Sequence, residues 1–123
     1  MASCQKIKEY ILNNTAINLF TNFDYFGMND QLEELVQLLN DYNVTNNITL
    51  ESLIKYYNIQ DEDEKVKYIE DVLLPLVTGK AHFSYCKWIL DKCVRYFSNN
   101  RMYKKAADFE MKYLLEFKKY YFN

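Results

Sequence analysis

Glycine and proline are scarce in this chain, and that scarcity limits the folds open to it. Among 123 residues there are only two glycines, Gly27 and Gly79, and one proline, Pro75. All-β folds need many tight turns, and tight turns depend on glycine and proline because these residues adopt or preset the required backbone angles. The sequence therefore predicts an all-α protein built from a few long helices.

Length and composition predict a single helical domain that covers residues 1–123. A chain of this length is typical of one domain and buries about two-thirds of the surface that its unfolded form exposes. Half of the residues are apolar, which is enough for a hydrophobic core. No repeat, flexible linker or low-complexity tract divides the sequence. We expect a single compact bundle of five to six helices.

Apolar residues at helical spacing predict where these helices lie. A short helix is expected over residues 5–12. Residues 13–29 are rich in Asn, Thr and aromatic side chains, and they are predicted to form a loop or an irregular helix. Further helices are expected at about 30–42, 49–57, 61–79, 80–98 and 101–122.

Capping residues predict where several helices begin and end. Asp30 with Glu33 resembles a capping box, and Thr49 is placed to cap the next helix. The acidic run 61–64 favours a helix N-terminus, because the helix dipole is positive there. Pro75 is expected to bend the last turn of that helix, and Gly79 is expected to end it.

The three cysteines, Cys4, Cys86 and Cys93, indicate a reducing compartment. Cys86 and Cys93 are seven residues apart in one predicted helix, so their Cα atoms lie about 10 Å apart, beyond the ~7 Å limit for a disulfide. The sequence shows no signal-peptide pattern and no apolar run long enough for a transmembrane segment. We therefore expect the protein in the cytoplasm or the nucleus.

A metal site or a nucleophile could be built around His82, the only histidine. His82 and Cys86 are four residues apart and share a helix stripe with Ile89 and Cys93. A tetrahedral metal site would need further ligands, and a Cys–His nucleophile would need an orienting group and an accessible thiol. We prefer the alternative, a buried stripe in which cysteine acts as a small apolar residue. We expect no metal, no cofactor and no enzymatic activity, because phosphate-binding and calcium-binding loop patterns are also missing.

Charge is divided unevenly along the chain. Residues 1–79 hold 5 basic and 13 acidic side chains, a net charge of −8, and residues 80–123 hold 10 basic and 4 acidic, a net charge of +6. This asymmetry is typical of a protein that selects its partner electrostatically, such as an acidic protein, a nucleic acid, an anionic membrane or a second copy. The alternative is that the two halves pack against each other.

The predicted helix 80–98 carries an apolar half-cylinder that leaves out its tryptophan. Trp88 is expected on the opposite side of the helix. An exposed Trp beside Lys and Arg is the composition of an interface hot spot. The alternative is that a neighbouring helix or the aromatic segment 20–26 covers Trp88. The predicted partner-binding residues are Ser84, Trp88, Lys92 and Arg95.

The predicted helix 101–122 is apolar over a wider arc than one packing contact needs. One stripe consists of Met102, Ala106, Phe109, Tyr113, Phe117 and Tyr120. A second stripe beside it consists of Tyr103, Ala107, Met111, Leu114 and Tyr121. Either this helix is the centre of the bundle, or the second stripe is a binding face. We expect the second stripe to be the self-association surface of a homodimer.

These features predict a non-enzymatic helical module for protein–protein interaction. Phe, Tyr, Met, Ile, Asn and Lys number 58 against 10 for Gly, Ala, Arg and Pro, which indicates an AT-rich genome of a large DNA virus, a protozoan or a low-GC bacterium. Death-fold adaptors and Bcl-2-like regulators are helical modules of this size, so fold-level analogy suggests a virus-encoded modulator of host apoptosis or innate signalling. The sequence lacks the Gly-Arg centre typical of cellular Bcl-2 proteins, which weakens the second analogy. The alternative is a nucleic-acid-binding protein that uses the basic, aromatic-rich C-terminal half.

Overall fold

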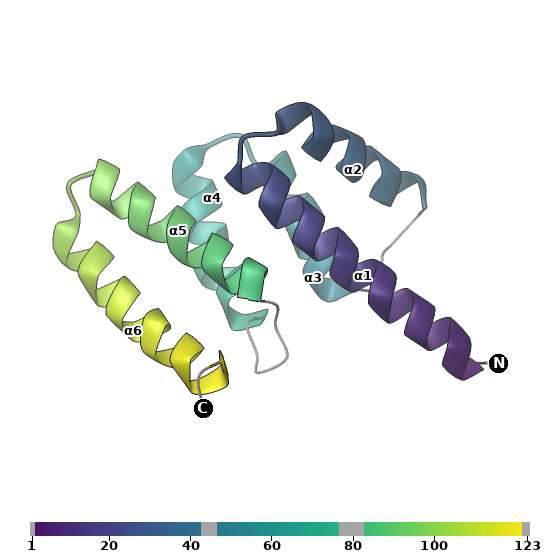
Figure 1. The fold of residues 1–123 in the computed structure, drawn as a ribbon. Helices are drawn as coiled ribbons and strands as arrows, with labels where there is room; N and C mark the ends of the chain where they lie inside the picture. The colour runs from purple at the N-terminus through teal and green to yellow at the C-terminus, as the bar shows by residue number, and fades with distance from the viewer. Residues whose placement is uncertain (1, 43–46, 77–82, 122–123) are drawn as a thin grey trace. The chain divides into compact units, whose positions relative to one another are not determined.

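The computed structural model describes residues 2–42, 47–76 and 83–121, and within them the side chains of residues 12–42, 47–76 and 85–115. Helices account for nearly all of these described residues, and none of them lies in a β-strand (Figure 1). The predicted all-α bundle of five to six helices is confirmed. Contacts between Cα atoms group the chain into two compact units, Met1–Asn58 and Ile59–Asn123. That residues 1–123 form one domain stays a prediction.

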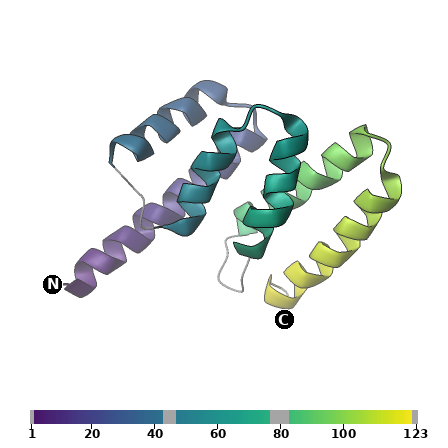
Figure 2. The ribbon, with the colours of Figure 1, turned by 180° about the vertical axis from the view of Figure 1, so that it is seen from behind.

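The first unit contains three helices, α1 (Ala2–Tyr25), α2 (Asn29–Asp41) and α3 (Ile48–Asn58). Helix α1 packs against both α2 and α3 (Figures 1 and 2). The apolar stripe predicted for α2 is confirmed, because its four buried residues recur at helical spacing. The buried apolar side chains of this unit are Ala16, Ile17, Phe20, Leu32, Leu35, Val36, Leu39, Leu50, Leu53 and Tyr56.

Helix α1 corrects the prediction of a loop or irregular helix over residues 13–29, because it runs without a break to Tyr25. Asn and Thr have low helix propensity, but burial of a regular face outweighs that preference. Ala16, Ile17 and Phe20 form such a face and are all buried. Thr21 is also buried, and its hydroxyl donates a hydrogen bond to the Ile17 carbonyl at 3.0 Å. The helix therefore satisfies this polar group internally.

Two helices begin at other residues than the predicted caps, Asp30 and Thr49, indicated. Helix α2 begins at Asn29, and its N-cap, Met28, makes no side-chain capping bond, so the capping box of Asp30 and Glu33 is wrong. Helix α3 is capped by Asn47, whose Oδ1 accepts a hydrogen bond from the Leu50 amide at 3.0 Å. The chain therefore enters each helix earlier than the capping patterns indicated.

The second unit begins with a helix that changes its winding twice. It runs through α4 (Glu62–Tyr68), a π-helical turn η1 (Ile69–Leu73) and a 3₁₀ turn η2 (Leu74–Leu76). The predicted acidic start is confirmed, because the Asp61 carboxylate accepts a hydrogen bond from the Glu64 amide at 3.0 Å. The predicted end at Gly79 lies outside the described residues.

Pro75 gives a physical reason for the change of winding. A proline has no amide hydrogen, and its ring clashes with the carbonyl four residues earlier in a regular α-helix. The Leu74 amide instead donates to the Ile69 carbonyl five residues back, which is a π-helical bond. The wider turn of η1 therefore precedes Pro75, and Pro75 itself lies in the 3₁₀ turn of η2.

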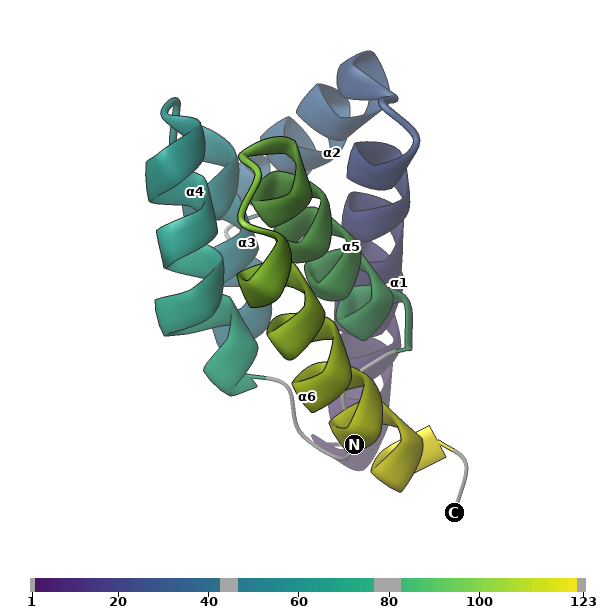
Figure 3. The same ribbon diagram turned by 90° about the vertical axis from the view of Figure 1, so that its left-hand side faces the viewer.

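Two antiparallel helices complete the second unit, α5 (Phe83–Asn99) and α6 (Tyr103–Tyr121), and they lie side by side (Figure 3). The rings of Phe97 on α5 and Phe109 on α6 meet edge to face, with centroids 5.8 Å apart. Ala106 is buried one turn before Phe109. This small residue and the ring pair let the two helices pack closely.

One buried hydrogen bond joins α5 to the preceding helix. The Tyr85 hydroxyl donates to the Leu73 carbonyl at 2.7 Å. Carbonyls in the last turn of a helix need partners from outside that helix. Burial raises the pKa of the Tyr85 hydroxyl, and the neighbouring Cys86 and Tyr68 raise it further, so this group remains a protonated donor.

Helices α1 and α5 end in the same way. The amides of Gly27 and Met28 donate to the carbonyls of Asp24 and Phe23, at 3.2 and 2.8 Å. In α5 the amides of Arg101 and Met102 donate to the carbonyls of Ser98 and Phe97, at 3.1 and 2.7 Å. Both sets of bonds form Schellman motifs, in which one residue takes a left-handed conformation. That residue is glycine at the end of α1, with φ 68°, and arginine at the end of α5, with φ 60°.

We expect opposite changes in stability at these two helix ends. Gly27→Ala should lower the free energy of unfolding by about 1 kcal/mol, because a Cβ is disfavoured at positive φ even though nothing lies within 4 Å of it. Arg101→Gly should raise it by about 1 kcal/mol for the same reason. Urea unfolding followed by circular dichroism measures both. Asn100→Gly is the control. It should not raise the free energy of unfolding, because among the described residues only Arg101 is a non-glycine residue with positive φ.

The hydrogen bond from Tyr85 to Leu73 gives a second expected change in stability. Tyr85→Phe keeps the ring but leaves the buried Leu73 carbonyl without this donor, which should cost about 1–3 kcal/mol. Tyr42→Phe, at an exposed position at the end of α2, should change stability by less than about 0.5 kcal/mol. Equal unfolding free energies for the two variants would show that the bond contributes nothing.

Candidate functional site

The structure corrects the predicted position of Trp88. Its side chain is only 1% exposed, and its ring stacks on Tyr85 with centroids 6.4 Å apart. The prediction treated α5 as having one buried face of constant width. Four of the five residues from 85 to 89 are buried, so the buried arc is wide enough in the first turns of α5 to include Trp88.

The other predicted partner-binding residues do not form a surface around an exposed tryptophan. Arg95 is exposed and pairs with Asp91 one turn earlier, at 3.2 Å. Lys92 is half-buried, and the side chain of Ser84 lies outside the described residues. With Trp88 buried, a hot spot centred on it is wrong, and a binding role for Lys92 and Arg95 stays a prediction.

Fluorescence tests the burial of Trp88, which is the only tryptophan in the chain. Its emission maximum should be blue-shifted in the native protein, because the indole is removed from water. Acrylamide and iodide should quench it weakly before unfolding and strongly after unfolding. Red-shifted, readily quenched emission from the native protein would contradict the burial.

The thiols of α5 are buried, as the preferred interpretation predicted. Cys86 and Cys93 are both enclosed. Burial, and to a lesser extent the Glu70 carboxylate, raise the pKa of the Cys93 thiol to about 12, although the Lys105 ammonium acts in the opposite direction. A thiol with this pKa holds little of the thiolate that nucleophilic attack and metal ligation require. His82 lies outside the described residues, and the described part of the chain holds no cluster of three or more potential metal ligands.

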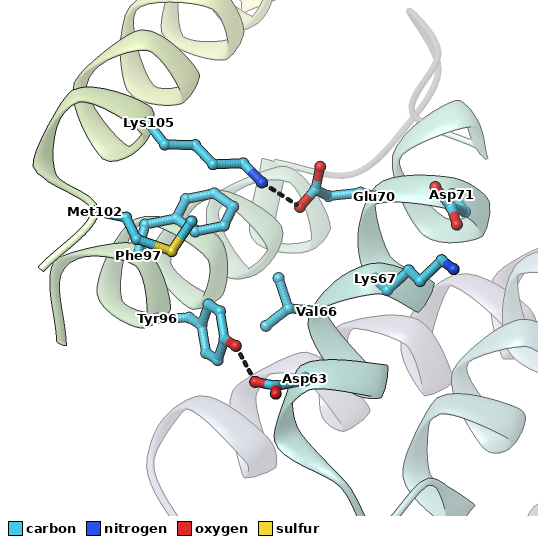
Figure 4. Close-up of a pocket in the computed structure, with 9 residues that line it drawn as sticks. All are labelled: Asp63, Val66, Lys67, Glu70, Asp71, Tyr96, Phe97, Met102 and Lys105. Carbon is cyan, nitrogen blue, oxygen red and sulfur yellow. Dashed lines mark hydrogen bonds and ion pairs between the residues drawn. The ribbon is translucent and has the colours of Figure 1, made fainter. Parts of the chain in front are cut away.

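The second unit contains an open groove of about 320 Å³ where α4 and η1 face α5 and the start of α6 (Figure 4). Its apolar lining includes Val66, Phe97 and Met102. Phe97 and Met102 are also joined by one of the two Schellman hydrogen bonds, so the end of α5 shapes this part of the groove. The remaining lining residues are Asp63, Lys67, Glu70, Asp71, Tyr96 and Lys105.

Two polar contacts cross this groove. The Tyr96 hydroxyl donates to the Asp63 carboxylate, and this hydrogen bond is the largest of several causes that raise the pKa of Tyr96. The Lys105 ammonium lies 3.7 Å from the Glu70 carboxylate and 4.6 Å from the centre of the Phe97 ring. Acidic residues before position 79 therefore meet side chains of the basic half across the groove. Some of the opposite charges that the sequence places in different halves of the chain therefore pair with each other inside this unit.

A second hollow of about 290 Å³ shares Glu70, Asp71 and Lys105 with the groove and continues along α6. Its apolar lining consists of Leu74, Phe109 and Tyr113, and Asp108 and Lys112 also line it. No sequence motif indicates either hollow, because the lining residues come from two distant segments, 63–74 and 96–113. The only sequence signal was the acidic run before a basic half.

Helix α6 presents an exposed apolar row on the side away from its buried residues. Ala106 and Phe109 of the first predicted stripe are buried, whereas Met102 is exposed. In the second stripe, Tyr103 is 65%, Met111 62% and Leu114 39% exposed, and Ala107 is exposed as well. The side chains of Phe117, Tyr120 and Tyr121 lie outside the described residues. The exposure of this stripe shows that α6 is not enclosed at the centre of the bundle.

Leu115 belongs to this row although the sequence prediction omitted it. Its side chain is 60% exposed, and it follows Met111 by four residues. Tyr103, Ala107, Met111 and Leu115 thus repeat at every fourth position. That spacing was the signal that could have identified Leu115, because residues four apart are neighbours on a helix surface. We call Tyr103, Ala107, Met111, Leu114 and Leu115 the α6 apolar face.

Comparison with known proteins adds no family and no relative. No family model matches the chain, and neither a curated protein nor a solved structure shows significant similarity to it. Among the described residues, no helix combines the length and the apolar character needed to cross a membrane.

Proposed function

We propose that this chain is a non-enzymatic protein–protein interaction module that self-associates through the α6 apolar face. The observation that carries the proposal is the exposure of this face on a helix whose other side is already packed against α5. Single exposed apolar residues are ordinary on protein surfaces. A group of exposed apolar residues that are neighbours on a single helix is typical of a contact surface.

The energetics favour covering this face. Burying a Leu or Met side chain contributes roughly 1.5–3 kcal/mol. Met111, Leu114 and Leu115 could together contribute several kcal/mol before the cost of association is subtracted. Exposed ion pairs contribute about 0–1 kcal/mol each, so apolar burial would dominate the contact. A second copy satisfies this requirement with the same surface on both sides, as a two-fold dimer does.

Nucleic-acid binding is the less supported alternative. Single-strand binding needs exposed aromatic rings beside basic side chains. Tyr85, Trp88, Phe97 and Phe109 in the basic half are buried. Lys105 and Arg95 already pair with carboxylates. Those rings are therefore not placed to stack on bases, and protein–protein contact is the better-supported hypothesis.

The cellular setting belongs to the same proposal. The composition of the chain supports an origin in an AT-rich genome, and its size and helical fold fit a virus-encoded modulator of host apoptosis or innate signalling. The odd number of cysteines fits a reducing cytoplasm or nucleus. An acidic protein is the heterologous partner that the net charge of +6 over residues 80–123 would favour.

Sedimentation velocity tests self-association at micromolar concentration. We expect a dimer of about 30 kDa, twice the 14.9 kDa of one chain. It should persist in 1 M salt, where the Debye length is only ~3 Å and exposed charge pairs are screened. Leu114→Lys should dissociate it, because the substitution places a charge in the apolar contact while leaving the packed side of α6 unchanged.

Leu38→Lys provides a matched control for this experiment. Leu38 is also an exposed leucine on a helix, but it lies on α2 in the first unit. That variant should remain dimeric, and both variants should unfold at the wild-type temperature within a few degrees. A wild-type monomer, or equal dissociation of the two variants, would overturn self-association through α6.

A further inference from the structure

The α6 apolar face has a geometry that restricts how two copies could pack. Tyr103, Ala107, Met111 and Leu115 form one row at four-residue spacing. Such rows are ridges inclined to the helix axis, and when the ridges of two helices interdigitate the axes cross at about 50°. Ala107 is the smallest side chain of the row and lies between two large ones. The helices can therefore approach most closely there.

Opposite charges flank this row on its two sides. Successive helical residues are rotated by about 100°, which places Lys104 about 60° to one side of Ala107 and Glu110 about 60° to the other. Both side chains are exposed. Lys104 precedes Ala107 by three residues and Glu110 follows it by three. The face therefore has a basic edge and an acidic edge at equal distances from its centre.

We propose that two copies pack through α6 in a parallel sense, about a two-fold axis near Ala107, with Lys104 of each copy facing the partner's Glu110. This inference rests on the proposed self-association and specifies its geometry. In a parallel two-fold pair, the basic edge of one helix lies against the acidic edge of the other, as flanking positions do in parallel coiled coils. A crossing of about 50° brings the two charges to similar heights along the axis.

The antiparallel alternative opposes this charge pattern. There the two basic edges would face each other, and so would the two acidic edges. Like charges placed together across a contact are unfavourable, whereas complementary charges fix register and orientation. The apolar row therefore supplies the attraction, and Lys104 with Glu110 selects the orientation.

Charge reversal on α6 tests the orientation. Lys104→Glu should weaken the dimer by roughly ten-fold, because it places two acidic groups at each edge contact. Glu110→Lys should weaken it by a similar factor. The double variant Lys104→Glu with Glu110→Lys restores opposite charges in the parallel dimer, and it should recover the wild-type Kd within about two-fold. Sedimentation equilibrium at low salt measures the four constants.

Glu33→Lys on α2 is the matched control, because it reverses an exposed carboxylate in the first unit and should leave the Kd unchanged. Circular dichroism should show that every variant keeps its helical content and melting temperature. If the wild type is dimeric and the single reversals have no effect, the parallel pairing is wrong while self-association stands. Weakening that the double variant does not reverse would also overturn the pairing. A monomeric wild type would instead overturn the proposed function.

Discussion

The second unit depends on how its first helix stops. Pro75 prevents the α-helix from continuing, and the π-helical and 3₁₀ turns beside it change the register of the backbone bonds. The Leu73 carbonyl in this region accepts a hydrogen bond from the hydroxyl of Tyr85, which lies in the first turn of α5. A buried hydrogen bond between a helix end and the start of the next helix fixes where α5 begins. Helix α6 then takes its position from α5, through the left-handed turn at Arg101 and the ring contact of Phe97 with Phe109.

The charged groove and the α6 apolar face of this unit differ in what they contact. Across the groove, Glu70 pairs with Lys105, and Asp63 accepts a hydrogen bond from Tyr96. These contacts link α4 and η1 to the hairpin of α5 and α6. The α6 apolar face has no such contact in the described structure of one chain. Partly screened ion pairs add little to stability but constrain geometry. These contacts fix the position of α6 against α4 and η1, and the α6 apolar face on its opposite side stays exposed.

The helical fold could be predicted because its signals lie within short segments of the sequence: glycine is scarce, and apolar residues recur at helical spacing. Leu32, Leu35, Val36 and Leu39 are buried as their spacing indicates. The prediction failed where tertiary burial outweighs local preference, as in α1 around Thr21, whose hydroxyl is satisfied within the helix. It also failed for Trp88, because a helical wheel cannot show how far around α5 the neighbouring structure extends. The exposed stripe of α6 was predicted, and its four-residue spacing could have added Leu115. The groove required coordinates, since contacts such as Lys105 with Glu70 join distant segments.

The short turn between α5 and α6 has a kinetic consequence. Only residues 100–102 separate the two helices, so closing the hairpin costs little loop entropy and depends on contacts between residues close in the chain. Local contacts of this kind form early in folding. In the proposed self-association, the rows of α6 would then be in place before a second molecule arrives, and association would be the docking of a preformed surface. Its rate would fall in the range of about 10⁵–10⁷ M⁻¹s⁻¹, which is set by diffusion and by mutual orientation.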